Sequence, residues 1–172
     1  MFRLISNSPA ALEGYVNLSG ALNKGTLPPQ TRERIALTVA EINGCSYCLS
    51  AHADIGKNLS KLDDAEIAAN RGGSSHDPKA EAALRFVAKV VRARGHVSDA
   101  DVQAVKAAGY DDALVIEIVL HVALNTWTNF INDGQDRHRL SARRGPRGSL
   151  MPNAFAPPAF LALPEAQSSM PH

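Results

Sequence analysis

Residues 29–57 read PQTRERIALTVAEINGCSYCLSAHADIGK and predict two consecutive helices joined by a sharp turn. The first helix begins after Pro28-Pro29, because proline suits the first helical turn. It ends at Asn43-Gly44, where glycine permits the left-handed backbone that commonly closes a helix. The second helix begins at Cys45 or Ser46 and ends near Lys57. A connection this short is typical of helix bundles.

The chain on both sides of this pair continues the helical pattern. Further helices are expected at about residues 8–24, 63–71, 78–94, 98–109 and 111–133, the last being the longest and most apolar. Asp77 is a capping candidate, and Ser98 to Asp101 resembles a capping box with Asp in place of Glu. Alanine is frequent, aromatic residues make up 5%, and no segment alternates as a strand would. The sequence therefore predicts an all-α, single-domain bundle of about six to seven helices.

Composition excludes several classes of function. The 172 residues are 45% hydrophobic and carry a net charge of +1, which gives no global attraction to nucleic acid or to a membrane surface. The longest apolar run, Ala113 to Ala123, is interrupted by Glu117 and His121 and is shorter than the roughly 20 residues that span a bilayer. The N-terminal residues do not resemble a signal peptide. We therefore expect a cytoplasmic protein.

The character of the sequence changes near residue 141. Six of the ten prolines lie between Pro146 and Pro171, and no helical periodicity remains. We divide the chain into a helical domain, residues 1–140, and a proline-rich C-terminal tail, residues 141–172. The tail is interpreted as loosely draped; the alternative is an arm that packs on a neighbouring subunit through Phe155, Phe160 and Leu161. A cluster of arginines lies around the start of the tail: Arg137, Arg139, Arg143, Arg144 and Arg147. It is interpreted as a solvated linker rather than a nucleic-acid-binding arm, because no aromatic residues are interleaved.

Both cysteines of the chain, Cys45 and Cys48, lie at the start of the second quoted helix. At 100° per residue, Cys45, Cys48 and His52 fall within a sector of about 60°, so one helix face carries two thiols and an imidazole. Free amide donors and the helix dipole favour a thiolate on Cys45, while His52 could accept the proton of Cys48. Two thiols at this spacing can also close into a disulfide.

A carboxylate is expected beside this face. Glu33 lies in register with Leu37 and Ala40 on the apolar face of the preceding helix, where a carboxylate needs a partner. His52 is the candidate partner of Glu33. Glu41, one turn before Cys45, is the rival acid, and a surface ion pair with a neighbouring arginine is the plainer interpretation of Glu33.

Together, Glu33, Cys45-Ser46-Tyr47-Cys48 and His52, preceded by Ile42-Asn43-Gly44, resemble the signature of the alkylhydroperoxidase D-like (AhpD-like) proteins of the carboxymuconolactone decarboxylase superfamily. The resemblance is strong over about residues 28–59 and extends to Gly134 only in pattern. It implies an all-helical homo-oligomer, a trimer or a hexamer, that reduces hydroperoxides with electrons from an unidentified dithiol donor. No cofactor is implied, because the thiols carry the chemistry.

The resemblance also implies a role for each site residue. Cys48 would attack the peroxide and Cys45 would resolve the sulfenic acid as a disulfide, whereas the helix-start argument alone favours Cys45 as the attacking thiol. His52 would relay the proton and Glu33 would orient it. Tyr47 stands where the founding peroxidase of the family has a histidine, and a phenol is a poor base at neutral pH. A second proton relay is therefore not expected here.

Three alternatives remain open at this stage. The thiols could bind a metal with His52, although a structural zinc needs a fourth ligand such as Glu33 or a residue of a partner chain. The protein could be a non-catalytic thiol redox or metal sensor. It could also be a carboxymuconolactone decarboxylase-type enzyme with incidental cysteines, although that branch typically lacks the cysteine pair.

A polar stripe follows the last helix. It consists of residues at helical spacing on an otherwise apolar segment: His121, Asn125, Asn129 and Asn132. Such a stripe usually satisfies itself in the core or at a subunit interface, and the alternative is the lining of a substrate pocket. Trp127, Phe130 and Ile131 are interpreted as packing or oligomer contacts.

Overall fold

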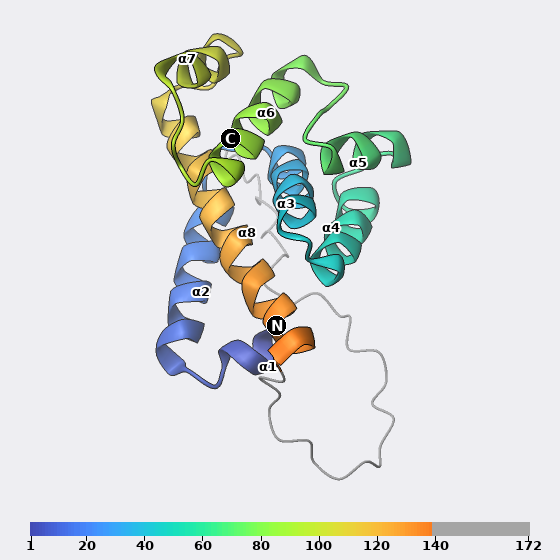
Figure 1. The fold of residues 1–172 in the computed structure, drawn as a ribbon, viewed down its shortest axis with the longest axis vertical. Coiled ribbons are helices and arrows are strands. Elements are labelled where there is room, and N and C mark those ends of the chain that lie inside the picture. The colour runs from blue at the N-terminus through green and yellow to red at the C-terminus, as the bar shows by residue number, and fades with distance from the viewer. Residues whose placement is uncertain (139–172) are drawn as a thin grey trace, which may run out of the picture. The chain divides into compact units, whose positions relative to one another are not determined.

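The computed structural model describes residues 1–138, with side chains described as far as Asp133. This part of the chain is all α-helical and contains no strand, as the sequence predicts (Figure 1). Its helices are α1 (Phe2–Ile5), α2 (Pro9–Asn23), α3 (Pro29–Asn43), α4 (Ser46–Asn58), α5 (Asp64–Arg71), α6 (Pro78–Arg92), α7 (Asp99–Ala107) and α8 (Asp112–His138).

The seven helices expected from the sequence are all present, and two details differ. The single turn α1 was not predicted, because four residues are too few to show a periodicity. Helix α8 continues past Asp133 and through Gly134 to His138, whereas Gly134 was expected to end it. A glycine inside a helix costs only about 1 kcal/mol and ends the helix only where the backbone leaves helical geometry. The tail at residues 141–172 lies outside the described residues.

The expected end signals act as predicted at most helix starts. The Asp77 side chain accepts hydrogen bonds from the backbone N–H groups of Lys79 and Ala80 at the start of α6. Ser98 and Asp101 form the predicted reciprocal capping box at the start of α7. These side chains satisfy amide donors that the helix itself leaves free, which fixes where each helix begins.

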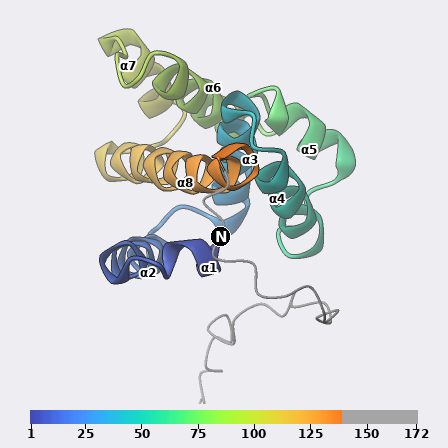
Figure 2. The same ribbon diagram turned by 60° about the horizontal axis from the view of Figure 1, so that its bottom comes forward.

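Helices α3 and α8 form the centre of the fold. Figure 1 shows α8 lying between α2 on one side and α3 on the other, with α7 at one end. In Figure 2 α3 crosses behind one end of α8. The main core lies between α3, α6 and α8, where Ile35, Leu84, Val87 and Ile118 are fully buried. Burial of such side chains contributes about 1.5–3 kcal/mol each, so this core holds α3 and α8 firmly together.

The buried surface of α8 is made of both apolar and polar residues. By length and composition alone, Asp112–Asp133 could cross a membrane. In this fold Val115, Ile118 and Val122 instead pack into the main core. The side of α8 that carries His121 and Asn125 is polar, and it is buried too. The core therefore accommodates a row of polar groups that needs a separate explanation.

The turn between α3 and α4 places the cysteines. Gly44 adopts a left-handed conformation with φ of 71°, as expected for the glycine that closes a helix. The Cys45 backbone N–H then donates to the Ala40 carbonyl at 3.0 Å. This turn directs α4 back along α3 toward α5, so that the first residues of α4 lie against the end of α3.

Candidate redox site

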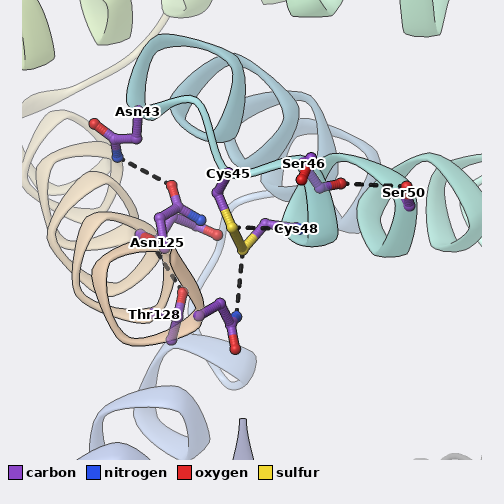
Figure 3. Close-up of a disulfide and its surroundings, with 9 residues drawn as sticks. Asn43, Cys45, Ser46, Cys48, Ser50, Asn125 and Thr128 are labelled. Carbon is purple, nitrogen blue, oxygen red and sulfur yellow. Dashed lines mark hydrogen bonds between the residues drawn. A yellow bond between two sulfur atoms is a disulfide. The ribbon is translucent and has the colours of Figure 1, made fainter. Parts of the chain in front are cut away.

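The cysteine pair lies at the start of α4 and faces the interior. Cys45 and Cys48 are joined by a disulfide, with their Cα atoms 5.3 Å apart. The two residues are only 2% and 4% exposed and pack with Ala40 and Leu49. Figure 3 shows the sulfurs in the space between the start of α4 and the side of α8 that carries Asn125 and Thr128. The inward orientation predicted from the helical stripe is confirmed.

Cys45 is the N-cap of α4, one residue before the helix proper. Its Sγ accepts a hydrogen bond from the Cys48 backbone N–H at 3.3 Å. A sulfur in the N-cap position takes the place that a serine or aspartate oxygen usually occupies. Cys45 therefore receives the helix-start stabilisation that the sequence predicts.

Cys48 receives its hydrogen bond from a distant part of the chain. The Asn132 Nδ2 group on α8 donates to Cys48 Sγ at 3.3 Å, across 84 residues of sequence. Asn132 is buried. The sequence places Asn132 in the polar stripe of the last helix but gives no reason to connect it with the cysteines, since no local spacing relates residues so far apart.

His52 and Glu33 meet on the side of the pair nearer the beginning of α3. His52 Nδ1 lies 2.8 Å from Glu33 Oε2, and both side chains are about one-fifth to one-quarter exposed. This is the partner that the helical register predicts for Glu33. A carboxylate accepts from the protonated Nδ1, which leaves Nε2 as the nitrogen that can take up or release a proton.

The competing partners of these groups are engaged elsewhere. Glu41, the rival acid, pairs with Arg71 at 2.6 Å between Oε2 and Nε. Arg34 pairs with Glu66, and Arg32 donates to the Leu22 carbonyl. Neither neighbouring arginine therefore forms the surface ion pair considered for Glu33, and Glu41 does not compete for His52.

The polar stripe of α8 is buried within the chain, in agreement with its interpretation as core. His121, Asn125, Asn129 and Asn132 are each less than 9% exposed. Asn43 Nδ2, at the end of α3, donates to Asn129 Oδ1 at 3.0 Å, and Asn125 Nδ2 donates to the His121 carbonyl at 2.8 Å. His121 Nε2 and Asn129 Nδ2 have no hydrogen-bond partner, which is rare for buried polar atoms.

His121 is held neutral by its surroundings. Burial and the nearby positive charge of Arg32 lower the pKa of His121 to about 4, although Glu117 and Glu33 act in the opposite direction. At neutral pH the imidazole is therefore uncharged. It adds a neutral polar group, rather than a charge, to the interior between α3 and α8.

The aromatic residues near the site have separate positions. Tyr47 is 51% exposed, so it is on the solvent side of α4 while the two cysteines face inward. Trp127 packs against Tyr15 of α2, with ring centroids 6.0 Å apart. Phe130 is exposed on α8. Trp127 is thus an intramolecular packing residue, and most of the Phe130 side chain is left exposed by the described chain.

Metal binding finds no support in the side chains that the structure describes. Among them, no group of three or more His, Cys, Asp or Glu residues is arranged to hold a metal ion. Cys45 and Cys48 bond to each other and His52 bonds to Glu33. The arrangement is that of a disulfide at the start of α4 and, further along the same helix, an imidazole that a carboxylate orients.

Comparison with known proteins agrees with the resemblance seen in the motif. Residues 9–89 match the sequence model of the carboxymuconolactone decarboxylase family. No match to this chain is found among curated proteins. An uncharacterized peroxidase-related protein from Silicibacter sp. has a similar crystal structure, with a TM-score of 0.68 and 25% identity over 75% of this chain and 70% of that one.

Two further crystal structures share the fold. One is the AhpD core of an uncharacterized peroxidase-related protein from Ralstonia eutropha, with a TM-score of 0.68 and 24% identity over 75% of this chain and 70% of that one. The other is a protein of unknown function from Agrobacterium tumefaciens, a candidate AhpD antioxidant defence protein, with a TM-score of 0.67 and 21% identity over 75% of this chain and 90% of that one. The predicted AhpD-like, all-helical fold is confirmed.

Proposed function

We propose that this protein is a thiol-dependent peroxidase that reduces hydroperoxides through the Cys45–Cys48 couple. The observation that carries the proposal is the combination of a buried, bonded cysteine pair at the start of α4 with a part-buried His52–Glu33 pair that joins the same helix to α3. The carboxymuconolactone decarboxylase and AhpD-like proteins include enzymes, and the similar structures are described as peroxidase-related.

The first step oxidises Cys48. Its proton passes to His52, and the Cys48 thiolate attacks the terminal oxygen of the hydroperoxide. The S–O bond forms as the O–O bond breaks, so that sulfur becomes a sulfenic acid and the leaving alkoxide is reduced to the level of an alcohol. Protonated His52 returns its proton to that alkoxide. Glu33 keeps His52 oriented throughout and stabilises its charged form.

The second step closes the cycle within the chain. The Cys45 sulfur attacks the sulfenic sulfur of Cys48, the S–S bond forms and water leaves. An external dithiol then reduces the disulfide by exchange and is itself oxidised to a disulfide. Because both cysteines are less than 5% exposed, this donor must reach into the protein or meet an opened form of it.

The proposed setting follows the expectations from the sequence. A reducing cytoplasm would supply the dithiol donor and keep the pair cycling. We propose a homo-oligomer, a trimer or a hexamer, in which a second copy covers the exposed apolar residues of α8, such as Ile116 and Phe130. No step of the proposed cycle needs a bound cofactor, a nucleic acid or a membrane.

A thiol count tests the proposed function directly. Reduced protein is mixed with one equivalent of an organic hydroperoxide, and free thiols are counted within seconds. We expect loss of both thiols with the chain still monomeric on a denaturing non-reducing gel, and repeated turnover when a dithiol is supplied. Cys45→Ser should form a sulfenic acid that a dimedone probe traps, whereas Cys48→Ser should consume no peroxide.

Three results would contradict the proposal. Full peroxide consumption by Cys48→Ser would remove Cys48 from the attacking role. Oxidation of both thiols once, with no turnover in the presence of several different dithiols, would indicate a redox sensor instead. Unreacted thiols together with activity that survives removal of both cysteines would indicate the decarboxylase-type alternative.

A further inference from the structure

The two sulfurs of the pair differ in the origin of their hydrogen bonds. Cys45 Sγ accepts from a backbone N–H of its own helix, whereas Cys48 Sγ accepts from the Asn132 side chain on α8. Helix-start stabilisation favours a thiolate on Cys45. The Asn132 donor is therefore a direct side-chain contact in favour of the other sulfur, in addition to the proton acceptor that His52 supplies in the proposed mechanism.

We infer that Asn132 is a positioning residue that selects Cys48, rather than Cys45, as the thiolate of the reduced pair. This inference rests on the proposed thiol chemistry but concerns a property of the reduced protein alone. It requires that a side chain on the long central helix, rather than α4, determine which sulfur is ionised.

The hydrogen bond should strengthen when the pair is reduced. A sulfur in a disulfide is a weak acceptor, while a thiolate carries a full negative charge and accepts strongly. Asn132 is buried at the site, so water does not compete freely for its Nδ2 group. A hydrogen bond to a charged group is strong enough to change a pKa by about one to two units.

Asn132 is held ready for this role by its helix. It lies on the buried face of α8, three residues after Asn129, which Asn43 of α3 contacts. The Asn43–Asn129 contact links the end of α3, and hence the turn that leads to Cys45, to the same stretch of α8. This contact holds the end of α3 against α8, and it therefore helps to keep Asn132 close to the sulfurs.

Other charged or titratable groups on the surrounding helices could also bias the pair. They are the Glu33–His52 ion pair of α3 and α4, the Glu41–Arg71 ion pair, neutral His121 on α8, and Asp133, the next residue after Asn132. Of the described side chains, Asn132 makes the one side-chain hydrogen bond recorded to either sulfur. This direct contact is what its substitution removes.

The test measures the thiol pKa of each cysteine separately. Cys45→Ser leaves Cys48 alone and Cys48→Ser leaves Cys45 alone, and thiolate absorbance near 240 nm is followed against pH in reduced protein. We expect Asn132→Leu to raise the pKa of Cys48 by about one to two units and to leave that of Cys45 unchanged. In the two-cysteine protein, iodoacetamide should alkylate Cys48 first, and Asn132→Leu should shift the Cys48-to-Cys45 ratio at least about tenfold toward Cys45.

The chain offers a matched control. Asn125→Leu makes the same substitution on the same buried face of α8, at a residue that bonds the His121 carbonyl and neither sulfur. It should change neither pKa. If Asn132→Leu does not fold, Asn132→Asp keeps the shape of the side chain and replaces the donor with a negative charge, so it should raise the pKa of Cys48 further.

Two results would overturn the inference. One is an unchanged pKa of Cys48 in folded Asn132→Leu or Asn132→Asp, and the other is an equal shift at Cys45. Because these titrations use no peroxide and no dithiol, they are independent of turnover. An inactive protein with the expected pKa shift would refute the proposed function alone, and an active protein without the shift would refute the role of Asn132 alone.

Discussion

Two polar clusters in the described part of the chain include residues of α3, and they are built differently. Around Glu66 on α5, the carboxylate accepts from Arg34 Nε at 2.7 Å, Asn70 Nδ2 at 2.9 Å, Ser75 Oγ at 2.5 Å and the His76 backbone N–H at 2.9 Å. At the redox site each sulfur has a single donor, recorded at 3.3 Å.

The difference separates a structural network from a reactive one. Burial raises the pKa of Glu66, but its hydrogen bonds and the charge of Arg34 outweigh this and lower the pKa to about 2. Such a carboxylate has no remaining capacity for chemistry and ties α3, α5 and the following loop together. Unpaired buried atoms occur in both clusters, at Asn70 Oδ1 beside Glu66 and at His121 Nε2 and Asn129 Nδ2 on the α8 side of the redox site. The number of donors is what differs, because the Glu66 carboxylate has several and each sulfur has one.

The largest expected effect is on activity at the redox site. His52→Asn removes the group that moves the proton, and we expect kcat/KM for an organic hydroperoxide to fall by about 100- to 10,000-fold. The free energy of unfolding should change by less than about 1 kcal/mol, because the side chain is 24% exposed and its one recorded partner is Glu33. Stopped-flow kinetics and urea unfolding measure the two quantities. A large loss of stability with little loss of activity would make this pair structural, like Glu66.

Glu66→Gln should show the reverse pattern. It removes the charge that faces Arg34 Nε at 2.7 Å in a nearly buried position, where the Arg34 and Glu66 side chains are 13% and 8% exposed. Arg34 then keeps only the longer, more exposed ion pair with Asp77 at 3.7 Å. We expect the free energy of unfolding to fall by about 3 kcal/mol, while kcat/KM of the folded fraction stays within about twofold. Urea unfolding and peroxidase assays on the same preparation check both values. The comparison between the clusters fails if activity drops as far as stability.

The sequence predicts the local part of the redox site well and the distant part poorly. Cys45, Cys48 and His52 lie within eight residues on one helix, so the 100° rotation per residue relates them directly. Glu33 and His52 are 19 residues apart, but their helices are consecutive and joined by one short connection. Helical register is therefore enough to pair them. The role of Asn132 depends on how α8 packs, 84 residues away, and no periodicity carries that information.

The Glu66 network was missed for a related reason. Two of its donors come from Ser75 and the backbone of His76 in a loop, and one comes from Arg34, 32 residues earlier. A loop conformation is not encoded in a hydrophobic pattern. Its only sequence signal was an acidic residue in the first turn of α5, where acidic residues are common and usually exposed.

At low pH, protonation of the Glu66 carboxylate should lower the free energy of unfolding. The folded pKa of about 2 lies below the reference value of 4.5, so the folded state binds its proton later than the unfolded state. The stability due to this difference is complete above about pH 4.5 and is lost as the pH falls toward 2. Urea unfolding at several pH values should show a steeper decline over this range in the wild type than in Glu66→Gln. Parallel curves would contradict the pKa difference.

His121 should produce a separate decline at higher pH. Its folded pKa of about 4 lies below the reference value of 6.5, so between these values the unfolded state binds a proton that the folded state does not. Stability should therefore fall as the pH decreases from 6.5 to 4, and His121→Gln should flatten the curve over this range. Because Gln keeps a polar side chain, the slope is the informative quantity rather than the absolute stability. An unchanged slope would place the titration elsewhere.

The smallest expected effect is at Tyr47, on the side of α4 away from the cysteines. Tyr47→Phe removes only the hydroxyl from a side chain that is 51% exposed, so we expect stability to stay within about 0.5 kcal/mol of the wild type. We also expect kcat/KM to stay within about threefold, because within one chain the phenol lies on the solvent side while the sulfurs are buried. A loss above about tenfold without loss of stability would mean that the hydroxyl acts in a site completed by a second copy of the chain. Measuring kcat/KM of the wild type and Tyr47→Phe above and below the concentration at which the chains associate would then distinguish that shared site from an effect within one chain. For a shared site, the difference in kcat/KM between the two proteins disappears on dilution, whereas for an effect within one chain it stays the same.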